Sequence, residues 1–175
     1  MPEDVRKRMR ELRLMIFDVD GVLTDGTLYV SDNGAEMKAF NVRDGHGLKM
    51  LKESGVEVAL LSARRSRVVD LRAAELGIAL VEQGAADKSA AFDALLARAR
   101  LSSSAAGYMG DDVVDLPVLV RCRFAASVPE APDTVRRSVH HVTRAPGGRG
   151  AAREVCELIM QAQDTLERAI ARNLG

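Results

Sequence analysis

Aromatic residues are scarce in this chain, which has no tryptophan and only 3% aromatic residues in total. Stacking on nucleobases depends on such side chains, so a platform for single-stranded nucleic acid is poorly supplied. A surplus of positive charge is missing as well, because 25 Lys and Arg residues balance 25 Asp and Glu residues. A neutral chain lacks the attraction that drives binding to nucleic acid or to an acidic membrane surface. We therefore expect neither nucleic acid nor a membrane as a partner.

Long hydrophobic segments and cysteine clusters are also lacking. No stretch approaches the roughly 20 apolar residues of a membrane span, and residues 1–13 are too charged to resemble the apolar part of a signal peptide. The two cysteines, Cys122 and Cys156, lie far apart in apolar surroundings, which favours two reduced, buried thiols over a disulfide or a metal site. These features predict a cytoplasmic protein.

What the chain does have is a regular alternation of short apolar runs and helical patterns. With 175 residues, 47% of them hydrophobic, it is long enough for one domain over residues 1–175 with a buried core. The predicted strands are residues 14–17, 56–61, 78–81 and 105–109, with weaker candidates at 124–127 and 139–142. The predicted helices are residues 45–54, 65–76, 88–100, 112–121, 132–137 and 150–172. Apolar strands separated by helices are typical of a parallel sheet covered on both faces, so we predict an α/β, doubly wound, Rossmann-like fold.

One segment near the start breaks this alternation. Residues 27–30 and 36–40 flank Ser31–Gly34, and the Asn-Gly pair in that turn is a strong signal for a β-hairpin. The predicted hairpin, at about residues 27–40, directly follows the first strand and cannot bury itself well alone. We expect it to cover a site, to join an interface between subunits, or to do both.

Acidic residues collect where the predicted strands end. Asp18 and Asp20 follow the first strand, and Asp111, Asp112 and Asp115 follow the fourth. Ligands of open parallel sheets bind at the carboxyl ends of the strands, where these carboxylates would repel one another without a cation. Hard oxygen ligands of this kind suit Mg2+, so we predict a magnesium cofactor. Asp111 would complete the metal site, with Asp112 and Asp115 binding the metal through water or orienting a neighbouring lysine.

The residue types at this edge of the sheet predict phosphoryl transfer. Asp18 is the candidate nucleophile, since a carboxylate that attacks phosphorus forms an aspartyl-phosphate and divides hydrolysis into two easier steps. Asp20 is placed to protonate the leaving oxygen and later to deprotonate the attacking water. Ser62 follows the second strand and Lys88 begins a helix. Together with the metal, these two side chains would neutralise charge on the transferring phosphoryl oxygens.

Four motifs in this chain resemble, in order and at fitting spacing, those of the haloacid dehalogenase superfamily: Asp18–Thr24, Ser62, Lys88 and Gly110–Asp115. The resemblance implies that Asp18, the backbone carbonyl of Asp20 and Asp111 hold the metal. In that superfamily, the presence of Asp20 favours a phosphatase over a dehalogenase.

A closer resemblance covers about residues 12–163. Four segments are similar to the 3-deoxy-D-manno-octulosonate (KDO) 8-phosphate phosphatase family, a capless branch of the superfamily: Asp18–Gly26, Asn41–Gly45, Gly147–Gly150 and Arg153–Cys156. The resemblance implies hydrolysis of that sugar-acid phosphate in lipopolysaccharide precursor synthesis, no cap domain, and a homotetramer. In that family, hairpins pair across subunits and the tail reaches a neighbour's active site. It thus assigns roles to the hairpin and to the C-terminal tail and helix, at about residues 145–172.

A sugar acid carries a carboxylate besides its phosphate, so its binding needs further cations, and guanidinium groups pair bidentately with both anions. Together, the resemblance and this chemistry predict the following substrate-binding residues: Asp20, Asn41, Val42, Arg43, Asp44, Gly45, Lys49, Arg64, Arg72, Lys88 and Arg149. Arg64 is placed most firmly because it follows Ser62 by two residues, whereas Arg149 would act from a neighbouring subunit. Two positions depart from the family, since Ala63 replaces a usual glycine and Lys49 a usual arginine.

Three alternative functions stay open at this point. A phosphatase for the 9-phosphate of a nine-carbon, sialic-type sugar acid would share the capless form and similar motifs. A non-catalytic binding module, as when this domain is appended to a nucleotidyltransferase, would not need intact Asp18, Asp20, Lys88 and Asp111. Transfer of the phosphate to an acceptor other than water is the third.

Overall fold

The chain folds around a six-stranded sheet in which every pair of neighbouring strands is parallel. The structure is a computed structural model and describes residues 2–172. The strands of this sheet are β1 Leu14–Phe17, β4 Glu57–Ser62, β5 Leu80–Gln83, β6 Ala106–Met109, β7 Phe124–Ser127 and β8 His141–Val142. Their spatial order is β5-β4-β1-β6-β7-β8. This confirms the predicted α/β, doubly wound, Rossmann-like architecture without a cap domain.

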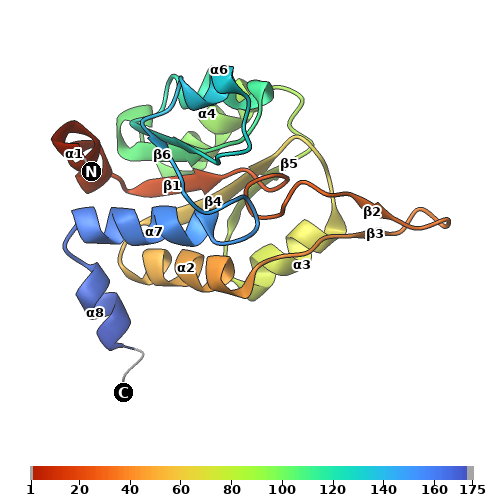
Figure 1. The fold of residues 1–175 in the computed structure, drawn as a ribbon, viewed down its shortest axis with the longest axis horizontal. Coiled ribbons are helices and arrows are strands. Elements are labelled where there is room, and N and C mark those ends of the chain that lie inside the picture. Colours follow the sequence, from red (N-terminus) through yellow and green to blue (C-terminus); the bar gives the residue numbers. More distant parts are fainter. Residues whose placement is uncertain (1, 173–175) are drawn as a thin grey trace.

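Helices cover both faces of the sheet. They are α1 Glu3–Arg10, α2 Val42–Glu53, α3 Arg67–Glu75, α4 Lys88–Ala99, α5 Leu116–Leu119, α6 Asp133–Arg136, α7 Ala151–Ala162 and α8 Leu166–Ala171, with short 3-10 turns at Ser103–Ala105 and Val113–Asp115. In Figure 1, α2, α3 and α7 lie on one side of the sheet, and α4 and α6 lie on the other. Helices α2 and α7 pack directly against each other.

The strand order reverses at β1, and this reversal positions the site. From β1 the chain builds outward through β4 to β5, and it then returns to the opposite edge of β1 to form β6. Phe17, the last residue of β1, lies in register with Leu60 of β4 and Met109 of β6. The residues that follow β1 and β6 therefore emerge side by side, at the kind of switch point where open α/β sheets bind their ligands.

The core is almost entirely aliphatic, as the shortage of aromatic residues requires. Every residue of β1, β6 and β7 is buried, and the buried apolar side chains form one continuous cluster. Burying apolar area of this extent is the main favourable contribution to the fold. Cys122 and Cys156 are buried free thiols, as predicted. Within residues 2–172, no helix combines the length and the hydrophobicity needed to span a membrane.

The predicted hairpin is present, but its strands are shorter than predicted. Strands β2 Tyr29–Val30 and β3 Glu36–Met37 pair antiparallel, and the backbone N–H of Gly34 donates to the carbonyl of Ser31 to close the turn. Figure 1 shows the hairpin projecting well beyond the body of the molecule. Because the hairpin has little of the chain to pack against, each of its strands is only two residues long.

The structure also corrects three secondary-structure predictions. Helix α1 was not predicted, because its many charges hide the apolar spacing of the buried Val5 and Met9. The third strand lies at residues 80–83 rather than 78–81, since the register of β5 on β4 starts with Leu80 opposite Ala59. The region from 112 to 121 forms a 3-10 turn and the short α5 instead of one helix.

The final helix, predicted as one element over 150–172, is two helices. Between α7 and α8, Asp164 adopts a left-handed conformation with φ of 57°, which ends a right-handed helix. The side-chain amide of Gln163 donates to the carbonyls of Met9 and Leu12. Contacts with the N-terminal segment therefore hold the turn, and no local pattern could have indicated them.

Candidate active site

The predicted nucleophile and lysine form the centre of the site. Asp18 follows β1 and Lys88 opens α4, and the Lys88 Nζ lies 3.0 Å from Asp18 Oδ2. Both side chains are buried, as is Ser62 at the end of β4. These three residues, together with Asp20 and Arg64, line a cavity of about 200 Å³ at the carboxyl edge of the sheet. The sheet topology thus brings together residues that lie up to 70 positions apart in the chain.

Asp115 holds this centre in place. Its Oδ1 accepts hydrogen bonds from Lys88 Nζ at 2.5 Å and from the Tyr108 hydroxyl at 2.5 Å. Its Oδ2 accepts from the backbone N–H groups of Asp111 and Asp112, both at 3.0 Å. All four acceptor positions of the carboxylate are engaged, so Asp115 orients Lys88 and shapes the loop that carries Asp111.

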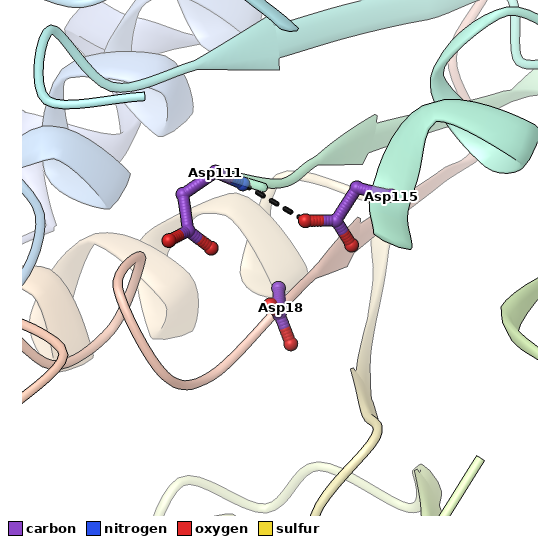
Figure 2. A group of neighbouring side chains, drawn as sticks. All are labelled: Asp18, Asp111 and Asp115. Carbon is purple, nitrogen blue, oxygen red and sulfur yellow. Dashed lines mark hydrogen bonds between the residues drawn. The ribbon is translucent and has the colours of Figure 1, made fainter. Parts of the chain in front are cut away.

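Two of the acidic residues are free to hold a cation. Carboxylate oxygens of Asp18, Asp111 and Asp115 lie within 4.8 Å of one another. Figure 2 shows the three side chains converging from the ends of β1 and β6 and from the turn that follows, with Asp115 bonded to the backbone of Asp111. Because Asp115 is already saturated, Asp18 and Asp111 are the carboxylates with oxygens to offer. The assignment of Asp18, Asp20 and Asp111 as metal ligands stays a prediction. Oxygen donors of this kind suit Mg2+.

The protonation behaviour of these carboxylates reflects their crowding. Burial, and then the negative charge of Asp115, raises the pKa of Asp18 to about 8 even though Lys88 opposes the shift. Burial and Asp115 likewise raise the pKa of Asp111 to about 6. Burial lowers the pKa of Lys88, but the attraction of Asp18 and Asp115 outweighs it and the net shift is upward. With both carboxylates deprotonated, the centre carries excess negative charge that a divalent cation would relieve.

A residue of the hairpin, Lys38, binds the side chain of Asp20. Lys38, just after β3, forms an ion pair with Asp20 Oδ1 and lies 3.3 Å from Glu36 Oε1. Arg64 reaches the same group, with its NH2 3.2 Å from Glu36 Oε1 and its Nε 3.9 Å from Asp20 Oδ2. The Arg64 side chain is 50% exposed and lines the cavity. It can therefore contact a ligand there.

Most of the other predicted substrate-binding residues lie around the start of α2. The side chain of Asn41 accepts from the backbone N–H of Arg43 and so caps this helix. Val42, Arg43 and Lys49 are exposed to solvent. Asp44 is buried and accepts hydrogen bonds from the backbone N–H groups that begin α7, so this chain uses it to join two helices.

Arg72 lies apart from the nucleophile. Its guanidinium stacks over Phe40 at 5.6 Å and donates to the carbonyl of Asn41. Gly45 leaves the space that this guanidinium occupies, since a Cβ there would lie 2.2 Å from Arg72 NH2. Within the described chain, these residues line a small hollow of their own rather than the cavity at Asp18, so a role toward that cavity stays a prediction.

The C-terminal tail packs on the catalytic loop of its own chain, which is the loop that follows β1 and begins with Asp18. The backbone N–H of Gly148 donates to the carbonyl of Val22, and a Cβ on Gly147 would lie 1.9 Å from the carbonyl oxygen of Gly21. Arg149 is exposed, with its NH2 3.7 Å from Asp25 Oδ2. The tail also lines a second cavity, of about 410 Å³, whose lining includes Asp111.

Two residues of the site were missed by sequence reasoning. Tyr108 lies in the predicted strand 105–109 and was given no role, although a hydroxyl inside an otherwise apolar buried strand needs a partner. Lys38 falls in the second predicted strand of the hairpin, at residues 36–40, and was given no role. Its signal was the alternation of Glu36, Met37 and Lys38, which places the two charged side chains on the same face of the hairpin.

The histidines take no part in this centre. His140 Nδ1 accepts from the backbone N–H of Ala125 and its ring stacks on Phe124. His141 pairs with Glu154 at 3.3 Å, and His46 is exposed on α2.

The site combines a buried carboxylate held against a lysine, a second carboxylate two residues later and a third after a later strand. This arrangement, on a doubly wound sheet without a cap domain, is that of a phosphatase of the haloacid dehalogenase superfamily. No family model matches the chain, but individual proteins do. The 3-deoxy-D-manno-octulosonate 8-phosphate phosphatase KdsC of Yersinia pestis is 44% identical over 167 residues, covering 95% of this chain and 89% of the relative. The chain therefore belongs to the family of 3-deoxy-D-manno-octulosonate 8-phosphate phosphatases.

Solved structures agree. The enzyme of that name from Moraxella catarrhalis, in complex with a magnesium ion, a phosphate ion and a KDO molecule, is 39% identical. It superimposes with a TM-score of 0.95 over 98% of this chain and 99% of its own. A probable yrbi family phosphatase from Pseudomonas syringae is 46% identical, with a TM-score of 0.96 over 99% of both chains.

Proposed function

We propose that this protein hydrolyses 3-deoxy-D-manno-octulosonate 8-phosphate to the free sugar acid and inorganic phosphate. The observation that carries the proposal is the position of Asp18. It is buried at a strand end, 3.0 Å from Lys88, and lines the same cavity as Asp20, Ser62 and Asp111. Membership of the phosphatase family narrows the substrate to a sugar-acid phosphate.

The reaction has two halves. In the first, an oxygen of Asp18 attacks phosphorus, the bond from phosphorus to the sugar oxygen breaks, and Asp20 donates a proton to that oxygen. In the second, water attacks the aspartyl-phosphate, Asp20 accepts its proton, and phosphate leaves with Asp18 restored. The ammonium of Lys88, already oriented by Asp115, stabilises charge on the phosphoryl oxygens in both halves.

The donor set fits Mg2+. The carboxylates of Asp18 and Asp111, with the backbone carbonyl of Asp20, would hold it, and all three donors are oxygens. The raised pKa values of Asp18 and Asp111 fit the same conclusion, because both report negative charge that lacks compensation. A bound Mg2+ would supply positive charge where the phosphoryl group is transferred.

We propose that Arg64 recognises the sugar acid together with residues that neighbouring subunits of an oligomer contribute to the site, such as Arg149. Arg64 is half exposed at the cavity rim, where it can pair with a carboxylate or a phosphate. We propose a homotetramer in which hairpins contribute to the interfaces, supported by the exposed apolar side chains of Leu28, Tyr29, Val30 and Met37. Large exposed apolar side chains gathered on one projecting element favour burial against another protein surface.

We place the reaction in the cytoplasm and in lipopolysaccharide precursor synthesis. The two free, buried cysteines agree with a reducing compartment. The assignment to lipopolysaccharide precursor synthesis follows from the substrate for which the family is named, since its hydrolysis yields the free sugar acid.

Phosphate release tests this function directly. The purified protein is assayed with and without Mg2+ on KDO 8-phosphate, a sialic-type 9-phosphate and common hexose phosphates, with the variant Asp18→Asn as control. We expect a Mg2+-dependent preference for KDO 8-phosphate, and a loss of more than about 1,000-fold in the variant, because it lacks the nucleophile.

The outcomes separate the alternatives. Preference for the 9-phosphate would replace the substrate and keep the chemistry. Full activity in Asp18→Asn would refute the aspartyl-phosphate mechanism, and no turnover by the unmodified protein would support a non-catalytic binding module.

A further inference from the structure

The hairpin places a buried ammonium against the residue expected to move the proton. The side chain of Lys38 is 1% exposed although it belongs to a projecting hairpin. It contacts Asp20 Oδ1 and, at 3.3 Å, Glu36 Oε1. Burying a lysine on an exposed element is costly unless its charge is compensated, so this contact is a specific one.

The two oxygens of Asp20 are treated differently. Oδ1 accepts from Lys38, whereas Oδ2 has Arg64 Nε only at 3.9 Å, beyond hydrogen-bonding distance. Oδ1 is therefore engaged by Lys38, whereas Oδ2 is left open toward the cavity that Asp20 lines. Glu36 balances the charge of Lys38, so the four side chains Asp20, Glu36, Lys38 and Arg64 have no net charge.

We propose that Lys38 is a positioning residue for proton transfer. By holding Oδ1, it fixes the rotation of the Asp20 carboxyl and presents Oδ2 to the leaving oxygen of the substrate. The inference rests on the proposed phosphatase function, but not on which sugar is the substrate. It also makes the hairpin part of the catalytic apparatus, because an unfolded hairpin would leave Asp20 without its orienting partner.

Substituted phenyl phosphates test this role, because they are nearly equal in size and differ in how much their leaving group needs a proton. A poor leaving group depends on the general acid, whereas a good one departs as an anion. The quantity measured is kcat/KM across the series, since it reports phosphoryl transfer to Asp18.

For Lys38→Met, we expect a loss of about 10- to 100-fold on the poorest leaving group and of less than about 3-fold on the best. Lys38→Arg should recover most of the loss, because it keeps a donor. In the Asp20→Asn background, Lys38→Met should cause no further loss, since the group it positions is gone.

The matched control is Lys7→Met, which removes an exposed lysine on α1. An equal loss of kcat/KM on every phenyl phosphate, or a further loss in the Asp20→Asn background, would overturn the proposal in favour of a general structural role. If Lys38→Met does not assemble, Lys38→Gln in the same series decides by the same criterion. Failure of the unmodified protein on all phenyl phosphates and sugar phosphates would instead contradict the proposed function.

Discussion

At the scale of single residues, Asp115 explains how a cluster of carboxylates can exist in a buried place. Its oxygens bind one ammonium, one hydroxyl and two backbone N–H groups. Each of these donors compensates part of the cost of burying the charge. Asp18 and Asp111 have less compensation, so the site gains most when a cation binds to them.

This imbalance predicts how pH and Mg2+ act on stability. The pKa of Asp18 is raised from 3.8 to about 8, so the metal-free folded state takes up a proton that the unfolded state releases. Stability of the metal-free protein therefore falls as the pH rises from about 4 to 8. Mg2+ binds the deprotonated carboxylates, and the increase in melting temperature that it causes should be several degrees larger at pH 8 than at pH 5.5.

Thermal unfolding with and without Mg2+ at both pH values measures this difference, and other titrating groups cancel in the comparison. The double variant Asp18→Asn, Asp111→Asn serves as control and should show no increase with Mg2+. An equal increase at both pH values would contradict the predicted metal site.

At the scale of elements, a single buried carboxylate joins α2 to α7. Asp44, on α2, accepts from the backbone N–H of Gly150 at 3.1 Å and of Arg153 at 2.8 Å. These N–H groups have no partner inside α7, because the first turn of a helix leaves its donors free. The residue therefore caps a helix that lies more than a hundred positions later in the chain.

Asp44→Ala should accordingly destabilise the protein by about 1–3 kcal/mol, since two partly buried N–H groups lose their acceptor. Asp44→Asn keeps one acceptor oxygen and should lose less. Urea unfolding of both variants measures the effect, and equal stability of Asp44→Ala and the unmodified protein would show that the cap contributes nothing. A rise in KM for Asp44→Asn without loss of stability would support the predicted contact with substrate.

The tail and the catalytic loop also form one packed unit. The Cβ of an alanine at position 147 would lie 1.9 Å from a backbone oxygen that cannot move away without displacing the loop after Asp18. Gly147→Ala should therefore cost about 1–3 kcal/mol of stability and reduce turnover as well.

Gly55→Ala is the comparison for this variant. Its added methyl group meets nothing within 4 Å, although its φ of 107° brings some backbone strain. Calorimetry and phosphate release on both variants measure the effects. If Gly147→Ala were as active as Gly55→Ala, the tail would not control the loop.

At the scale of the whole molecule, the exposed apolar side chains of the hairpin have no explanation within a single chain. Its residues Val30 and Met37 are 65% and 66% exposed, and a hairpin of this size is marginally stable alone. We expect light scattering to give the mass of a tetramer. The double variant Val30→Asp, Met37→Asp should yield smaller species, because charge on those positions opposes burial. A monomeric unmodified protein would overturn the shared-site arrangement.

The sequence alone determined the parallel sheet and the location of its chemistry. Apolar runs of strand length are a local signal, and an acidic residue directly after such a run must emerge at the sheet's carboxyl edge. Asp18, Ser62 and Asp111, which follow predicted strands, could therefore be predicted to meet, with Lys88 added from its place at a helix start. The structure places all four around one centre. The break in the last helix could not be predicted, because contacts with the N-terminal segment hold it.

Only the tertiary structure decided which group each polar side chain serves. The family resemblance predicts that Asp44 binds substrate, and that stays a prediction; in the structure its oxygens contact backbone donors 106 and 109 residues away. Lys38 contacts Asp20 across 18 residues, and Tyr108 reaches Asp115 through a buried hydroxyl. Whether a hydrogen bond of this kind forms depends on differences of a few tenths of an ångström in the distance between separate elements. Packing sets those distances, and a pattern along the chain does not contain them.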